Sequence, residues 1–295
     1  PACVPATVGT WAVALARFGT MTYSQVLQPA IELAENGFPL YDGLQNALRN
    51  NYERFTELYP TTGEVYYDRG RVPEYGEIIR NPAFGKSLRM MCKAENEAKS
   101  RGRVAGIEAA CDAFYRGPIA ERIVKFITDN PVQDATGKSH SGLLTYEDIS
   151  DWHASVEETV SYDYKGLTVH KCPSWTQGPT FLQHLAILDG IDIKAMGHNS
   201  AEYLHTWLES TKLAFADREA YYGDPLFDEV PLDILLSREY NNTRRELIGS
   251  TASMEQRPGD VGNGIPAYAI TDIVDDNRAA LGIAGTVPGE QDLKD

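Results

Sequence analysis

The sequence has few cysteines and no long apolar run. No stretch approaches the ~20 consecutive apolar residues that a membrane-spanning helix needs, so no membrane span is expected. The four cysteines, Cys3, Cys92, Cys111 and Cys172, form neither a CxxC pair nor a Cys/His cluster with ligand spacing, which argues against a metal site. We interpret Cys92 and Cys111 as small apolar residues on helices, although a disulfide between them stays open.

Basic residues are also in the minority. Lysine and arginine together number 27, against 42 aspartate and glutamate residues, which gives a net charge of −15. A surface of this sign repels phosphate groups, so nucleic acid is not an expected partner. The apolar fraction of 42% is ordinary for a globular protein, and 295 residues are enough to bury a core.

Familiar catalytic motifs are missing as well. The sequence contains no GxSxG nucleophile elbow and no HExxH zinc motif. The histidines His170, His184, His198 and His205 are isolated, and we interpret them as core or surface residues. The residues alone therefore indicate no nucleophile paired with a base, and no metal ligand set.

Two further candidates have an ordinary and a functional interpretation. Asp217, Arg218 and Glu219 form a dense charge cluster on a predicted helix, and we favour an ion-paired helix face over an active-site wall. Pro1 would act as a catalytic secondary amine only if it were a mature N-terminus in a pocket, and we do not favour that role.

Residues 1–130 show mostly helical patterns. Thr22 and Gln25 form a capping box that starts a helix, and Gly37 ends it. The elements that follow are predicted as a helix over residues 42–58, a strand over 64–67, a tight turn over 68–71, a helix over 82–100 and a surface loop over 130–142.

The middle of the chain predicts short strands followed by helices. In order, these are a short helix from Thr145, strands over residues 156–164 and 167–171 joined at Lys165 and Gly166, and a helix over 180–188. Apolar and polar residues alternate only partly along the strands, so we expect one buried face and one mixed face.

Residues 198–225, HNSAEYLHTWLESTKLAFADREAYYGDP, carry the most informative pattern. Asn199 or Ser200 can cap a helix, and the final Gly-Asp-Pro run ends it. Apolar residues recur at near-helical spacing, namely Leu204, Leu208, Ala214 and Phe215. We predict a buried helix over residues 200–222, with Leu208 in the core.

The C-terminal part, residues 249–295, is rich in glycine, proline and aspartate and has little periodicity. It holds eight acidic and three basic residues and few large apolar ones. This composition is typical of a linker or a poorly ordered terminus.

Several segments resemble one known family in the order of their residues. They are VPATVGTWAVALARFGTMTYSQVLQPAIELAENGFPL (4–40), AFYRGPI (113–119), LLTYEDI (143–149), VSYDYKGLTVHKCP (160–173), QGPTFLQHLAIL (177–188) and LAFADREAYYGDP (213–225). They closely resemble segments of the γ-glutamyltranspeptidases, which are self-cleaving N-terminal-nucleophile hydrolases. Because the matches run in the family's order over residues 4–240, chance is an implausible explanation.

The resemblance implies a fold and a division of the chain. The family fold is α+β, a four-layer αββα sandwich, to which this chain would contribute mostly helices and a few strands. Residues 1–248 would form a large-subunit core without the family's N-terminal segment. Residues 249–295 would form a tail that leads to the autoprocessing site.

The resemblance also implies where the chemistry lies. The nucleophile would be a threonine directly after Asp295, freed when the precursor is cut at Asp295, and its own α-amine would act as the base. No catalytic residue is then expected in this chain, and no substrate-binding residue is assigned, since the family's carboxylate-binding arginine belongs to the missing N-terminal segment. No metal or organic cofactor is implied.

The implied partners are the small subunit of the same precursor and a small γ-glutamyl or acyl-amide substrate. The chain would then be the large-subunit part of an enzyme that hydrolyses or transfers γ-glutamyl groups, for example from glutathione. One alternative is an acylase of the same superfamily that cleaves glutaryl or cephalosporin-type amides. Another is a non-catalytic scaffold whose precursor is never cut.

Overall fold

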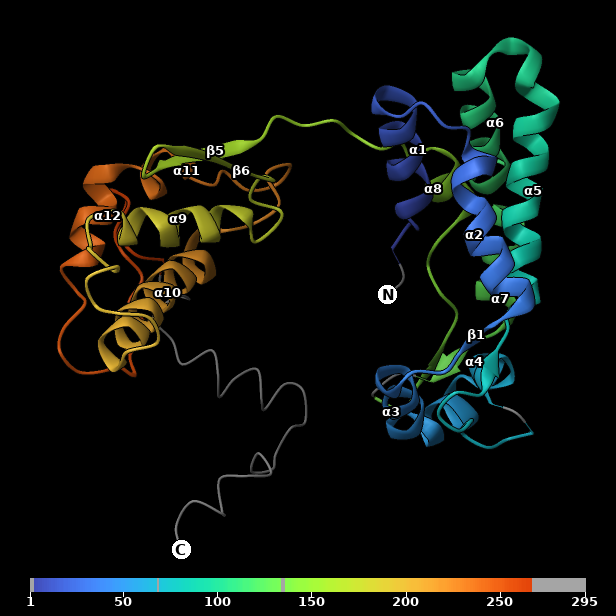
Figure 1. Cartoon of the computed structure of the whole chain (residues 1–295), viewed down its shortest axis with the longest axis horizontal. Coiled ribbons are helices and arrows are strands. Elements are labelled where there is room, and N and C mark those ends of the chain that lie inside the picture. Colours follow the sequence, from blue (N-terminus) through green and yellow to red (C-terminus); the bar gives the residue numbers. More distant parts are fainter. Residues whose placement is uncertain (1–2, 68, 134–135, 267–295) are drawn as a thin grey trace, which may run out of the picture. The chain divides into compact units, whose positions relative to one another are not determined.

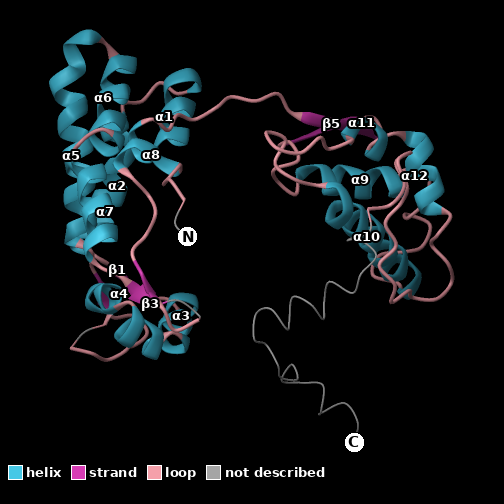
Figure 2. Ribbon diagram, turned by 180° about the vertical axis from the view of Figure 1, so that it is seen from behind, coloured by secondary structure: helices cyan, strands magenta, loops and turns pink. Residues whose placement is uncertain are grey.

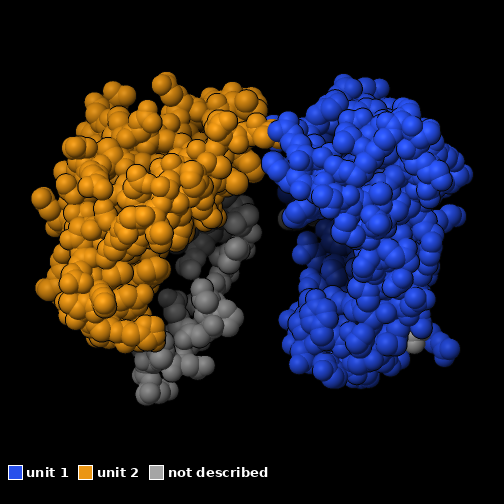
Figure 3. All heavy atoms as spheres, turned by 45° about the horizontal axis from the view of Figure 1, so that its top comes forward, with its two compact units in different colours: residues 1–155 blue, residues 156–295 orange. Residues whose placement is uncertain are grey.

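The computed structural model describes residues 3–67, 69–133 and 136–266 of the chain (Figure 1). The chain groups into two compact units, Pro1–Ser155 (unit 1) and Val156–Asp295 (unit 2), which Figure 3 colours separately. Helices predominate and the strands are short (Figure 2). Across the described ranges, no helix combines the length and the apolar character needed to cross a membrane. The division predicted between residues 248 and 249 concerns a mature subunit, and it stays a prediction.

The larger part of unit 1 is a bundle of helices around an apolar cluster. Its helices are α1 (Thr7–Phe18), α2 (Tyr23–Asn36), α5 (Pro82–Ala98), the short 3₁₀-helix η2 (Lys99–Arg101), α6 (Arg103–Tyr115) and α7 (Pro118–Asp129). The predicted capping box at Thr22 and the start of α5 at Pro82 are confirmed. Ile31, Met91 and Ile107 fill the cluster, each about 1% exposed, and α5 and α6 lie side by side (Figure 1).

Residues 38–79 of unit 1 form a second apolar cluster, and one element in it differs from the prediction. Its elements are β1 (Phe38–Pro39), α3 (Asp42–Asn50), the π-helix η1 (Arg54–Leu58), α4 (Pro60–Tyr66) and β2 (Ile78–Ile79), with β1 antiparallel to β2. The strand predicted over residues 64–67 is wrong, because Pro60 stands at the first position of α4 and pre-sets the helical conformation. Tyr67 then packs beside Leu40 and Leu48.

The end of unit 1 follows the sequence prediction more closely. Residues 130–142 are exposed where they are described, and the short strands β3 (Val132–Gln133) and β4 (Ser139–His140) pair within this loop. The helix α8 (Tyr146–Ser150) begins at a capping box formed by Thr145 and Asp148, as predicted.

Unit 2 begins with a hairpin that packs on a buried helix. The strands β5 (Val160–Tyr164) and β6 (Leu167–Lys171) are antiparallel, with Tyr162 opposite Val169. Lys165 and Gly166 have φ angles of 49° and 85°, so both residues of the predicted turn are left-handed. The remaining helices are α9 (Gly178–Leu188), α10 (Ala201–Tyr221), α11 (Leu232–Leu235) and α12 (Arg238–Arg245).

Helix α10 is present where the sequence predicted it, but the predicted buried face is wrong. Ser200 caps its N-terminus, with Oγ accepting a hydrogen bond from the Tyr203 amide. Leu208 is 58% exposed, however, and Leu204 and Phe215 are exposed as well. Apart from Leu213, the buried face carries small and polar side chains, namely Thr206, Glu209, Ser210, Ala214, Ala216, Asp217 and Ala220.

Candidate functional site: the strap on α10

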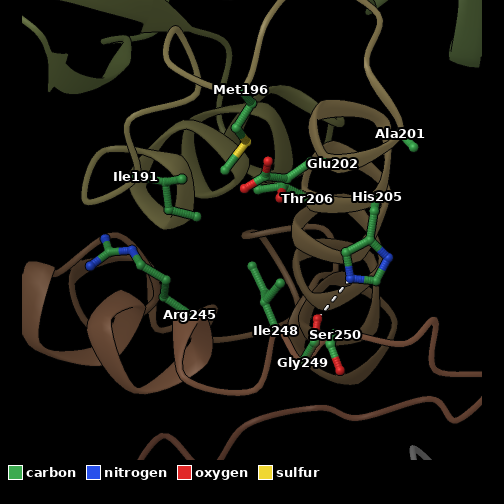
Figure 4. A pocket seen from close by; sticks show the side chains of 10 residues that line it. All are labelled: Ile191, Met196, Ala201, Glu202, His205, Thr206, Arg245, Ile248, Gly249 and Ser250. Carbon is green, nitrogen blue, oxygen red and sulfur yellow. Dashed lines mark hydrogen bonds between the residues drawn. The ribbon is translucent and has the colours of Figure 1, made fainter.

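The segment that follows α12 lies along α10, and we call residues 249–259 the strap. His205 donates a hydrogen bond from Nε2 to the carbonyl oxygen of Gly249 at 2.7 Å, which Figure 4 marks with a dashed line. Farther along, Lys212 Nζ donates to the Ser253 carbonyl at 2.6 Å, and the Tyr221 hydroxyl donates to the Gly259 carbonyl at 2.5 Å. The strap therefore runs in the same direction as α10, from its first turns to its last.

Glu209 anchors the middle of the strap. Its side chain is 2% exposed and accepts hydrogen bonds from Arg257 Nη2 at 2.9 Å and from the Ser253 amide at 3.2 Å. Lys212 forms an ion pair with the same carboxylate. Burial opposes ionisation here, but these donors and the nearby positive charges outweigh it, so the pKa of Glu209 lies below its ordinary value.

Asp217 anchors the end of the strap, two helical turns after Glu209. It is fully buried, and its Oδ1 accepts from the Gly259 amide at 2.7 Å. Its Oδ2 accepts from Gln183 Nε2 at 2.5 Å and from Arg244 Nε at 3.0 Å. Burial raises the pKa of Asp217, and the Arg244 charge and the hydrogen bonds offset only part of that rise.

Arg244 and Arg257 connect the two anchors. Arg244 of α12 donates from Nη2 to the Leu213 carbonyl at 3.3 Å and also to the carbonyl of Arg257. Arg257 in turn donates from Nη1 to the Leu247 carbonyl at 2.9 Å. The result is one buried network that ties α9, α10, α12 and the strap together.

An open hollow of about 670 Å³ lies beside the start of α10 and of the strap (Figure 4). Its wall is mostly apolar, with Ile191, Met196 and Ile248, and it includes His205. Arg245 also lines it, but its guanidinium group is held by the carbonyls of Ala186 and Ile187 at the end of α9. The hollow therefore presents no set of side chains arranged for acyl transfer.

The sequence model of one family, Gamma-glutamyltranspeptidase, matches residues 1–280. This chain belongs to the γ-glutamyltranspeptidase family. The glutathione hydrolase-like YwrD proenzyme of Bacillus subtilis (strain 168) is 31% identical over 270 residues, which cover 91% of this chain and 46% of that protein. The glutathione hydrolase proenzyme of Escherichia coli (strain K12) is 30% identical over 285 residues, covering 94% and 45%. The chain thus spans about half the length of these relatives.

The solved structures agree with this assignment. The cephalosporin acylase of Bacillus halodurans is 28% identical, with a TM-score of 0.72 over 86% of this chain and 43% of the acylase. Matching structures also include γ-glutamyltranspeptidases. The predicted fold class is therefore confirmed: the chain is a mostly helical part, with few strands, of an N-terminal-nucleophile hydrolase fold.

The residues that the sequence singled out take ordinary places in this member of the γ-glutamyltranspeptidase family. His184 is buried against Ser210, with 2.9 Å between Nε2 and Oγ, and His170 is exposed. All four cysteines are free, and no group of three metal-ligating side chains occurs in the described ranges. Asp295 and Pro1 lie outside the described residues.

The charge cluster at Asp217 separates into two parts. Arg218 and Glu219 form an ion pair at the surface, with Arg218 stacked 4.4 Å from the centre of the Phe215 ring. Asp217 points inward to Arg244. Sequence reasoning singled out Asp217 but missed Glu209 and the role that the two anchors share. Glu209 and Asp217 are eight residues apart and so lie on one helix face, a signal that could have indicated this shared role.

Proposed function

We propose that this chain is the large-subunit part of a γ-glutamyltranspeptidase-like enzyme that hydrolyses or transfers γ-glutamyl groups. The observation that carries the proposal is the family match over residues 1–280, by a chain that spans about half the length of relatives named as glutathione hydrolase proenzymes. The other half would supply the catalytic small subunit.

In this proposal the nucleophile is a threonine directly after Asp295, freed by self-cleavage of the precursor. Its hydroxyl attacks the γ-glutamyl amide carbon, and its α-amine, with an ordinary pKa of about 8, accepts the hydroxyl proton and passes it to the leaving amine. The resulting γ-glutamyl ester is resolved by water or by an amino-acid amine. The role of the present chain is to hold the fold that contains this residue and its substrate.

The test is to express the full-length precursor and to determine the intact masses and the N-terminal sequence of its products. We expect a smaller product that begins with threonine directly after Asp295. A product with another start would overturn the assigned bond. An uncut precursor without activity would instead support a non-catalytic scaffold.

A second candidate, an acylase that cleaves glutaryl or cephalosporin-type amides, has support from the 28% identity with a cephalosporin acylase. The loop Pro173-Ser-Trp-Thr-Gln-Gly-Pro179 also departs from the PPPSSGG-type loop that is common among the transpeptidases. Comparing kcat/KM of the processed enzyme for a γ-glutamyl anilide and a glutaryl anilide separates the two candidates. The acylase requires the higher value for the glutaryl compound, which lacks the α-amino group.

A further inference from the structure

The strap is held by polar contacts rather than by apolar burial. Pro258 is the one buried residue of the strap, and Met254 is 96% exposed. The contacts that hold it are instead directed at particular backbone atoms, including the amides of Ser253 and Gly259 and the carbonyls of Gly249, Ser253 and Gly259.

Contacts of this kind fix the alignment of the strap along α10 more than they increase the stability of the fold. A buried ion pair recovers little beyond its own desolvation cost, and its best-attested use is to fix register. If the strap slid by one residue, Glu209 would lose Arg257 and the Ser253 amide, and Asp217 would lose the Gly259 amide. Two buried carboxylates would then lack partners, so the strap has one favourable register on α10.

The strap also fixes where the chain leaves α10. Beyond Gly259, the carbonyl of which is held by Tyr221, the described chain continues past Glu229 and Ile234, where Val261 and Ile265 line a shared hollow. Without the strap contacts, the described chain after α12 would lie against unit 2 mainly around Val261 and Ile265. With them, it passes the far end of α10 in a set register.

We infer that Glu209, Asp217 and Tyr221 are positioning residues for self-cleavage, since they hold the strap in the register from which the chain continues to the bond after Asp295. This inference rests on the proposed function. Self-cleavage is an attack within one chain, and the rate of such an attack depends on how the reacting groups are placed. Loosening the strap should therefore slow cleavage while leaving the finished active site intact.

The experiment uses the full-length precursor, purified before cleavage is complete. Arg257→Met removes the charge that the strap offers to Glu209, and Tyr221→Phe removes one hydroxyl contact without creating a cavity. Arg257→Lys keeps the charge and serves as the conservative variant. Ser200→Ala is the matched control. It removes the N-terminal cap of α10, which should lower the stability of the helix as the loss of a cap typically does, and it leaves the strap contacts in place.

We expect Arg257→Met to lengthen the half-time of cleavage about ten-fold and Tyr221→Phe about three-fold, with Arg257→Lys restoring most of the rate. Circular dichroism should show every variant folded, and kcat/KM after completed cleavage should equal that of the wild type. Equal slowing by Ser200→Ala would show a general stability effect and overturn the inference. Wild-type cleavage rates in the strap variants would also overturn the inference, but they would not affect the proposed function. A wild-type precursor that is never cut would overturn both.

Discussion

The interior side of α10 carries two carboxylates, while Leu204, Leu208 and Phe215 of the same helix are exposed. Both carboxylates can be buried because each one has a positively charged partner. Glu209 pairs with Lys212 and Arg257, and Asp217 pairs with Arg244. A buried charge without such partners would cost several kcal/mol. Burial along this helix is therefore decided by available partners rather than by the hydrophobicity of each side chain.

Leu208 and Leu213 should respond differently to truncation. Leu213 is 1% exposed and packs against Ile187, so Leu213→Ala should lower the unfolding free energy by about 3 kcal/mol. Leu208 is 58% exposed, so Leu208→Ala should cost less than about 1 kcal/mol in this chain. Urea denaturation of both variants measures the difference. Equal losses would mean that Leu208 is as buried as the sequence pattern suggested.

His184 should make the stability of unit 2 depend on pH. Burial lowers its pKa below the ordinary 6.5, so the unfolded chain takes up a proton at a higher pH than the folded chain. The contribution of neutral His184 is therefore fully present above pH 6.5 and is lost as the pH falls below it. Urea midpoints at pH 7.5 and 5.5 should differ less for His184→Asn than for the wild type. An unchanged difference would assign the effect to other groups.

Single side chains were the part of the site least accessible from sequence. Nothing local to Asp217 indicates that Arg244 of α12 will meet it, because that contact depends on how α10 and α12 pack. The spacing of apolar residues in α10 predicted that the face with Leu208 is buried. A pattern of this kind takes no account of polar side chains that become buried because they pair with another helix. The isolated histidines were interpreted correctly for His184, which is buried without a charged partner in its hydrogen bonds.

At the scale of elements, local chemistry predicts boundaries well. The starts of α2, α8 and α10 follow from Thr22, Thr145 and Ser200, whose side chains accept hydrogen bonds from the following turn. The strap shows the limit of this approach. Its composition indicates a poorly ordered terminus, yet residues 249–259 are fixed by carboxylates far away in the sequence.

Hydrogen exchange should reveal the strap as an ordered element. The amides of Ser253 and Gly259 donate to buried carboxylates and should exchange more slowly than those of Thr251 and Gln256, whose residues are exposed. We expect this pattern both before and after cleavage of the precursor. Fast exchange at all four positions in either form would mean that the strap detaches from α10. Residues 267–295 of the predicted tail lie outside the described residues.

At the scale of the whole molecule, the two units carry separate apolar clusters, and the family relatives are about twice as long as this chain. In the function that we propose, the described part of the chain would support an active site whose reacting groups belong to the other half. The order of the family-like segments was enough to predict that the chain is one part of a longer enzyme. The side-chain contacts inside each unit could be found only in the structure.

The isolated chain should be catalytically inactive. Without the threonine that we place after Asp295, it has no nucleophile to form the γ-glutamyl ester. A γ-glutamyl anilide assay should give no release of the aniline above the blank, and addition of separately prepared small subunit is the matched comparison. Turnover by the chain alone would contradict the proposed division of roles.

The cysteines give each unit a built-in chemical reporter. Burial raises the pKa of Cys111 in unit 1 to about 11, and its thiol packs against the core of that unit. Cys172 in unit 2 is exposed. Alkylating reagents attack the thiolate, so at neutral pH they should modify the exposed Cys3 and Cys172 in the native protein and Cys111 only when unit 1 opens. The rate at which the peptide that carries Cys111 gains mass in a timed alkylation would thus record how often unit 1 opens, without any engineered label.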